Sequence, residues 1–116
     1  MNNNSAGKWG EFLTRTYLRC RGWQIIARNY ITGRGTKAGE IDIIAARGKT
    51  LIFVEVKKRC DLETAAYAIS PAQQVRIRRG AEAFLQKHPS YQEYTLRFDA
   101  ALVQFPMSLR YLENAF

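Results

Sequence analysis

The fold of this chain is decided by one stretch, residues 40–57, which reads EIDIIAARGKTLIFVEVK. Two apolar runs rich in β-branched residues flank the short segment 47–50, a pattern that predicts two strands joined by a turn. The pair Gly48-Lys49 suits a type II′ turn, because glycine readily adopts the positive φ that its first central position requires. The stretch therefore predicts a β-hairpin in which the numbers of directly opposed residues sum to 97.

This register brings acidic side chains together. Asp42 is expected to face Glu55, and Glu40 to face Lys57. Opposed residues of an antiparallel pair have Cβ atoms about 4.5–5.5 Å apart, where like charges destabilise a sheet. A hard divalent cation would relieve the repulsion, since Mg²⁺ prefers carboxylate oxygens. A simpler interpretation stays open, in which the acids are solvated at strand ends and Lys57 pairs with Glu40, and one bulge would change every pairing.

Working outward, the chain predicts two helices and further strands. Residues 5–21 read as a helix with Ser5 as N-cap and Gly22 just past its end. Its expected apolar stripe contains Trp9, Phe12, Leu13, Thr16, Tyr17 and Cys20. Ser70-Pro71-Ala72-Gln73 predicts a capping box that starts a helix over residues 70–86. Strands are expected over residues 23–31 and 94–105, a basic loop over 32–39 and a short final element within 107–116.

Length and composition indicate a single basic domain spanning residues 1–116. Lys and Arg number 18 against 10 Asp and Glu, a net charge of +8 that favours a polyanionic partner, with nucleic acid first and a membrane surface second. The chain has no apolar run long enough to cross a bilayer and no secretory signal, so a cytoplasmic protein is expected. Cys20 and Cys60 lack a CxxC context and are expected to be reduced, partly buried thiols.

An ordered set of motifs resembles the YraN family, bacterial proteins that are similar to archaeal Holliday junction resolvases. The set comprises Gly10-Glu11, Gly39-Glu40-Ile41-Asp42, Phe53-Val54-Glu55-Val56-Lys57, Phe98-Asp99 and Asn114-Ala115-Phe116. Its Asp and Glu-x-Lys part resembles the signature of the PD-(D/E)XK nuclease superfamily. The triplet alone is common, but the ordered set is more specific and covers nearly the whole chain. The resemblance implies a restriction-endonuclease-like α/β sandwich with a central mixed β-sheet flanked by helices.

The resemblance also implies roles for individual residues. Asp42 and Glu55 would be ligands of Mg²⁺ or Mn²⁺, with the Val56 carbonyl as a third ligand. Lys57 would lie beside the attacking water, where it could orient that water, lower its pKa, or stabilise the charge that grows on the phosphate in the transition state. Glu11 joins the metal site and the catalytic set only through the resemblance, because on a helical wheel it lies opposite the predicted stripe, where a solvated residue is the alternative.

Two further polar positions need an interpretation. Nucleases of this kind often place a polar residue at the start of the second helix, where it reaches the phosphate or the water. Gln73 stands where the family usually has Lys and is explained by the capping box, which leaves Gln74 as the catalytic candidate. Asp99 lies in an apolar strand and is expected to be a buried partner of another polar group.

Basic residues are expected around the mouth of this site: Arg34, Lys37, Lys58, Arg59, Arg76, Arg78 and Arg79. Together they could hold a phosphate backbone, although each alone is usually a solvated charge. The leading hypothesis is a metal-dependent DNA endonuclease that acts on branched or structured DNA, as a symmetric homodimer if it works as resolvases do. One alternative is a nucleic-acid-binding module of the same fold without turnover. Another is a structural protein that docks on an acidic partner.

Overall fold

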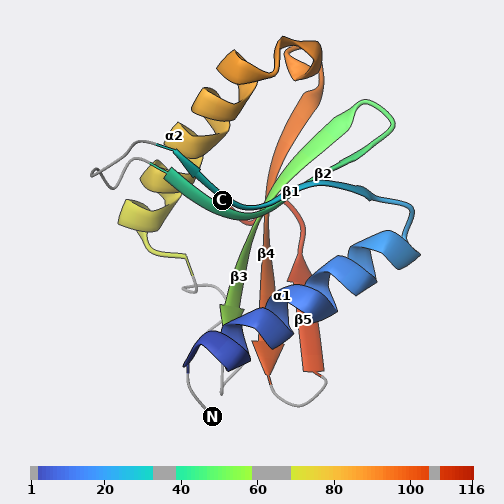
Figure 1. The fold of residues 1–116 in the computed structure, drawn as a ribbon, viewed down its shortest axis with the longest axis vertical. Helices are drawn as coiled ribbons and strands as arrows, with labels where there is room; N and C mark the ends of the chain where they lie inside the picture. The colour runs from blue at the N-terminus through green and yellow to red at the C-terminus, as the bar shows by residue number, and fades with distance from the viewer. Residues whose placement is uncertain (1–2, 33–38, 59–68, 105–107) are drawn as a thin grey trace.

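The computed structural model describes residues 3–32, 39–58, 69–104 and 108–116 (Figure 1). The elements in chain order are α1 (Asn3–Cys20), β1 (Gln24–Thr32), β2 (Gly39–Arg47), β3 (Thr50–Lys58), α2 (Pro71–Lys87), the 3-10 helix η2 (Pro89–Tyr91), β4 (Thr95–Gln104) and β5 (Ser108–Leu112). The strands form one sheet in the order β1-β2-β3-β4-β5. β3 and β4 are parallel and the other neighbours are antiparallel, which confirms the predicted mixed sheet and α/β class.

The two helices cover opposite faces of the sheet (Figure 1). On the α1 side the buried core contains Leu18, Trp23, Ile43, Ala45, Ile52, Val54 and Ala101. On the α2 side it contains Ile41, Ile44, Leu51, Phe53, Ile69, Ile77, Ala81, Phe84, Ala100 and Leu102. Because both cores draw on β2 and β3, the predicted hairpin is buried on both faces and lies at the centre of the molecule.

The hairpin forms with the predicted turn and register. Arg47 pairs with Thr50, and the pairing continues to Ile43 and Val54 with numbers that sum to 97. Gly48 has φ +60°, whereas Lys49 is not among the residues with positive φ, as a type II′ turn requires. The turn chemistry and the apolar pattern were therefore sufficient to place these two strands.

The predicted pairing is wrong beyond Ile43 and Val54, where the pairing of β2 with β3 ends. Asp42 does not face Glu55 across a ladder. Its carboxylate instead turns to β3, and Oδ2 accepts the Val56 backbone N–H at 2.8 Å. A side chain thus takes the place of a backbone carbonyl as acceptor, because the N–H of a half-buried strand needs a partner.

β1 is irregular at the same level. Its residues Arg28 and Tyr30 pair with Ile43 and Ile41, so the residue between them, Asn29, lies at the level of Asp42. Asn29 has φ +49°, a left-handed conformation that is uncommon outside glycine. Regular alternation would place Ile41 and Ile43 on one face, yet Ile41 packs in the α2-side core. The sheet is therefore distorted across both strands at Asp42.

Helix α1 ends as predicted and begins earlier. The N–H of Trp23 donates to the Leu18 carbonyl and that of Gly22 to the Arg19 carbonyl, both within 3.1 Å, with Gly22 at φ +89°. This is a Schellman motif, which confirms the role of the glycine. The helix starts at Asn3, so Ser5 lies in its first turn and is not its N-cap.

The predicted apolar stripe of α1 is wrong in its orientation. Phe12, Thr16 and Cys20 are exposed, while Gly10, Thr14 and Leu18 are buried against the sheet. A small residue at position 10 permits this orientation, because a Cβ there would already be in van der Waals contact, 3.4 Å from Val56 Cγ1 and 3.5 Å from Val103 Cβ. The Thr14 hydroxyl donates to the Gly10 carbonyl at 2.8 Å, so it is satisfied inside the interface. As a consequence, Glu11 borders the buried face of the helix.

Helix α2 confirms the predicted capping box. Ser70 Oγ accepts the Gln73 N–H at 3.2 Å, and Gln73 Oε1 accepts the Ser70 N–H at 3.1 Å. Pro71 occupies the first turn, where its missing N–H has no structural consequence. The helix ends at Lys87 before His88-Pro89, close to the expected boundary.

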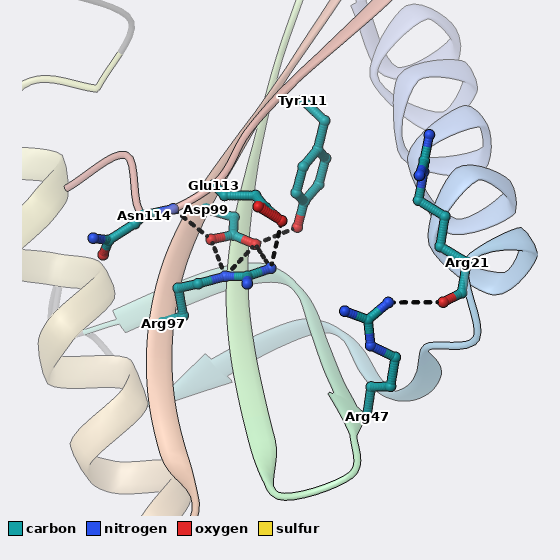
Figure 2. Close-up of polar contacts among 7 residues, drawn as sticks. All are labelled: Arg21, Arg47, Arg97, Asp99, Tyr111, Glu113 and Asn114. Atoms are coloured by element: carbon teal, nitrogen blue, oxygen red, sulfur yellow. Dashed lines mark hydrogen bonds and ion pairs between the residues drawn. The ribbon is translucent and has the colours of Figure 1, made fainter.

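Asp99 confirms its expected role as a buried polar partner (Figure 2). It is fully buried and accepts bonds from the Arg97 guanidinium at 3.0 Å, the Tyr111 hydroxyl at 2.6 Å and the Asn114 N–H at 2.9 Å. Burial and this hydrogen bond to Asp99 raise the pKa of Tyr111, so the phenol keeps its proton. The network ties β5 and the chain end to β4.

Two expectations from composition can be compared with the structure. Cys20 is a free thiol, but it is exposed rather than partly buried because α1 turns it away from the sheet; Cys60 lies outside the described residues. Of the helices that the structure describes, none combines the length and apolar character needed to cross a membrane.

The close approach of α1 to the sheet gives a prediction for Gly10. Gly10→Ala should be at least as stable as the wild type, because its Cβ meets the sheet at ordinary van der Waals distance and alanine favours a helix by about 0.5–1 kcal/mol. Gly10→Leu should lose about 1–3 kcal/mol, because the larger side chain overpacks the contact with Val56 and Val103. Urea unfolding of both variants measures the difference, and equal stability would contradict the described interface.

Candidate active site

Four carboxyl groups and one lysine gather where the pairing of β2 with β3 ends. Glu40 and Asp42 come from β2, Glu55 and Lys57 from β3, and Glu11 from α1. The Asp42 and Glu55 side chains share a hydrogen bond, and the charges of Lys57 and Glu40 also act on Glu55. Glu11 is affected by the charges of Asp42 and Glu40. The fold therefore brings together the four residues that the sequence motifs singled out, together with Glu40.

The Asp42–Glu55 pair forms the centre of this cluster. Burial is the largest cause that raises the pKa of Glu55, to about 9, followed by the hydrogen bond to Asp42 and the negative charge of Asp42. The positive charge of Lys57 acts in the opposite direction. Burial and the neighbouring Asp42 therefore favour the protonated form of Glu55, because two adjacent carboxylates in a half-buried site do not both ionise readily.

Asp42 is held in place from the backbone. Its Oδ2 accepts the Val56 N–H, so the carboxylate is oriented by the strand that also carries Glu55 and Lys57. Val56 itself packs on the α1-side core and lies against Gly10. Its carbonyl as a metal ligand stays a prediction.

Glu11 reaches the cluster because of the orientation of α1. Burial is the largest cause that raises its pKa, and the charge of Asp42 raises it further. A hydrogen bond from the Asn29 side chain and the charge of Arg15 lower it. Glu11 is therefore partly buried among polar and charged groups, and it is not the fully solvated residue that the predicted stripe allowed.

Sequence reasoning missed Asn29 as a member of the site. This residue holds Glu11 from the distorted part of β1 and has the left-handed φ described above. Such strain typically persists at functional sites, where the surrounding structure maintains it. The available signal was an asparagine inside a predicted strand, where its β-propensity is poor.

The donor set is compatible with one divalent cation bound by few protein ligands. Across the described residues, no three His, Cys, Asp or Glu side chains form a ready-made metal cluster. Mg²⁺ is commonly held by one or two carboxylates, with waters and substrate phosphates as the other ligands. Asp42 and Glu55 supply two such carboxyl groups, and a cation could replace the proton that they share. The residues present therefore fit a Mg²⁺ or Mn²⁺ ion.

The structure gives varying support to the remaining predicted residues. The Gln74 amide donates to the Ile69 carbonyl at 3.1 Å, a contact within the start of α2, and its catalytic role stays a prediction. Arg78 stacks over the Phe98 ring at 4.5 Å, so its guanidinium contributes to packing. Lys58 and Arg79 are exposed and Arg76 is half-buried. Arg34, Lys37 and Arg59 lie outside the described residues.

The fold is similar to that of a solved nuclease. The structure of Archaeoglobus fulgidus Hjc, a Holliday junction resolvase, matches with a TM-score of 0.51 and 20% sequence identity. The match covers 89% of this chain and 72% of that chain. At this level of identity the likeness is one of fold, and it confirms the expected nuclease-like α/β architecture.

Sequence comparison identifies closer relatives. A UPF0102 protein of Rhodopseudomonas palustris (strain BisB18) is 48% identical over 112 residues, which cover 96% of this chain and 79% of that protein. A UPF0102 protein of Paramagnetospirillum magneticum is 43% identical over 97 residues, 84% of this chain and 75% of that protein. The model of the uncharacterised protein family UPF0102 matches residues 10–103. The chain therefore belongs to the UPF0102 family, whose YraN members its motifs resemble.

Proposed function

We propose that this protein is a divalent-metal-dependent endonuclease that hydrolyses phosphodiester bonds in DNA, with branched or otherwise structured DNA as its substrate. The observation that carries the proposal is the hydrogen-bonded pair Asp42–Glu55 with the charge of Lys57 beside it. In this half-buried cluster the two carboxyl groups could serve as ligands of a metal ion. The lysine would supply the positively charged side chain that phosphodiester hydrolysis needs. The cofactor proposed is Mg²⁺ or Mn²⁺.

Each residue of the cluster has a task in this reaction. Asp42 and Glu55 would hold the cation, and Glu11, which accepts a hydrogen bond from the Asn29 side chain, would add a carboxyl on the α1 side. When bound, the cation polarises a phosphate oxygen and lowers the pKa of a water molecule. Lys57 orients the attacking water and stabilises the negative charge that develops on the phosphate oxygens.

The choice of DNA and of a branched substrate has separate support. The net charge of +8 favours a polyanion, and the similar fold of Hjc belongs to a Holliday junction resolvase. Cutting a junction symmetrically requires two active sites related by a two-fold axis, so a homodimer is part of the proposal.

The alternative is a nucleic-acid-binding module without turnover. Such a module needs the basic surface but has no use for a protonated carboxyl pair beside a lysine. Half-burying these acids disfavours folding at neutral pH, because the pKa of Glu55 is raised. The retention of this unfavourable arrangement favours the enzyme over the module.

Cleavage should depend on Lys57 and on the metal. Lys57→Ala and Asp42→Asn should each lower cleavage by about a hundredfold or more, because Lys57 supplies positive charge that stabilises the transition state and Asp42 is a proposed ligand of the metal. The assay compares labelled four-way junction, flap, single-stranded and linear duplex DNA with Mg²⁺, Mn²⁺ or chelator. Lys87→Ala, at an exposed position in the last turn of α2, is the control and should cleave like the wild type. Equal cleavage by wild type and Lys57→Ala would contradict the proposal.

The free energy of unfolding should fall as the pH rises, and this fall should depend on Glu55. Between its unfolded pKa near 4.5 and its folded pKa of about 9, the unfolded state loses the Glu55 proton and the native state keeps it, so the native state is progressively disfavoured as the pH rises. Glu55→Gln removes this effect and should be more stable than the wild type at pH 8 by about 1 kcal/mol or more, with a smaller difference at pH 4.

The same measurement reports on the metal. Mg²⁺ or Mn²⁺ at pH 8 should raise the melting temperature of the wild type more than that of Glu55→Gln, because an ionised Glu55 is a better ligand than an amide. Thermal unfolding at pH 4 and pH 8, with metal and with chelator, measures both effects. Parallel pH profiles of the two proteins would rule out the shared proton.

A further inference from the structure

A row of arginines lies beside the carboxyl cluster, on the flank of α1 that is next to β1. Arg15 and Arg19 follow Glu11 along α1 at intervals of four residues, so the three lie on one side of the helix with about 6 Å of rise per step. Arg28 lies on β1 directly opposite Ile43, whose side chain is in the α1-side core. Directly opposed residues share a face of the sheet, so Arg28 projects on the side of α1.

Arg19 and Arg28 both lie close enough to affect Arg15. The charges of Arg28 and Arg19, together with burial as the largest cause, lower the pKa of Arg15, and Glu11 alone opposes them. Among the described residues, the ion pairs present join Arg97 to Asp99 and to Glu113, so none of the row is neutralised in this way. The row therefore concentrates positive charge, and Arg15 is repelled by the other two guanidinium groups.

The Arg15 side chain also has a hydrogen-bond donor without an acceptor. Its Nε is buried and has no hydrogen-bond partner, the one such side-chain atom in the part of the chain that the structure describes. Buried donors are almost always satisfied, and each exception calls for an explanation such as an absent ligand. An anion beside Arg15 would accept this N–H and would also cancel the repulsion within the row.

We propose that Arg15, Arg19 and Arg28 form a binding site for the phosphodiester backbone of DNA. This inference rests on the proposed function, and it adds a contact surface on the α1 face, separate from the cations of α2. Guanidinium groups suit phosphate oxygens, because they offer several donors in one plane. Glu11 limits the row at one end, so the bound strand continues from the carboxyl cluster along α1 and β1. A strand fits better than a single free anion, since the row has three charges.

Binding without cleavage tests this site. The full chain is titrated in chelator against a fluorescein-labelled four-way junction and a linear duplex, by fluorescence anisotropy over a range of NaCl concentrations. Arg15→Gln/Arg28→Gln should weaken binding by roughly tenfold and reduce the slope of log K against log salt by about 2, because each lost phosphate contact removes about 0.9. Arg28→Gln alone, at an exposed position, should reduce the slope by about 1 and serves if the double variant is unstable.

The control removes the same charge elsewhere. Arg110→Gln/Lys87→Gln alters two exposed residues, and Arg110 pairs with Leu102 of the α2-side core, so it lies on the other face and at the other edge of the sheet. This variant should bind within about twofold of the wild type. Thermal unfolding of all variants confirms that they are folded.

The outcomes separate this inference from the proposed function. Equal affinity and salt slope for the arginine variant and its control would overturn the inference, even if cleavage depends on Lys57. A selective loss of DNA affinity would support it, even if the wild type cleaves nothing. Binding of inorganic phosphate that Arg28→Gln abolishes, with DNA affinity unchanged, would indicate a small-anion site and would also overturn it.

Discussion

The hydrogen bond from the Val56 N–H to Asp42 Oδ2 is the contact on which the candidate site depends. The pairing of β2 with β3 ends at Ile43 and Val54. Next to this end, the side chain of Asp42 takes the place of a backbone carbonyl as the acceptor. The hairpin remains anchored by its buried residues on both faces. A rigid sheet can therefore carry a half-buried carboxyl at a fixed position beside Glu55 and Lys57.

The arrangement at the candidate site is unfavourable for stability. Asn29 adopts a left-handed conformation, Glu55 is held protonated by burial, and Arg15 keeps a buried N–H without a partner. Each of these is unfavourable for folding alone, and all three lie at or beside the same cluster. Departures from local rules are expected at functional sites rather than in a purely structural domain. Asp99, by contrast, is fully buried with each oxygen satisfied, and its hydrogen bonds join β4 to β5 and to Asn114.

Local patterns were sufficient to predict much of the fold. Gly48, Gly22 and the Ser70–Gln73 box act through nearby backbone, so their roles could be inferred from neighbouring residues. The proximity of Asp42 and Glu55 was also predictable. The end of the ladder before Asp42 and the hydrogen bond from the Val56 N–H to its carboxylate were not. The orientation of α1 was not predictable from its apolar stripe, because it depends on how closely Gly10 approaches Val56 and Val103. The place of Glu11 and Asn29 followed from that tertiary contact.

The proposed function depends above all on whether Asp42 and Glu55 together hold a divalent cation. The most direct measurement is a crystal structure grown with Mn²⁺ near pH 8, with an anomalous difference map calculated at a wavelength where manganese scatters. We expect a peak within coordination distance of both carboxyls, about 2.0–2.1 Å from their oxygens if the ion is bound as Mg²⁺ would be. A crystal saturated with Mn²⁺ in which the two carboxyls remain hydrogen-bonded to each other, without a peak, would contradict it.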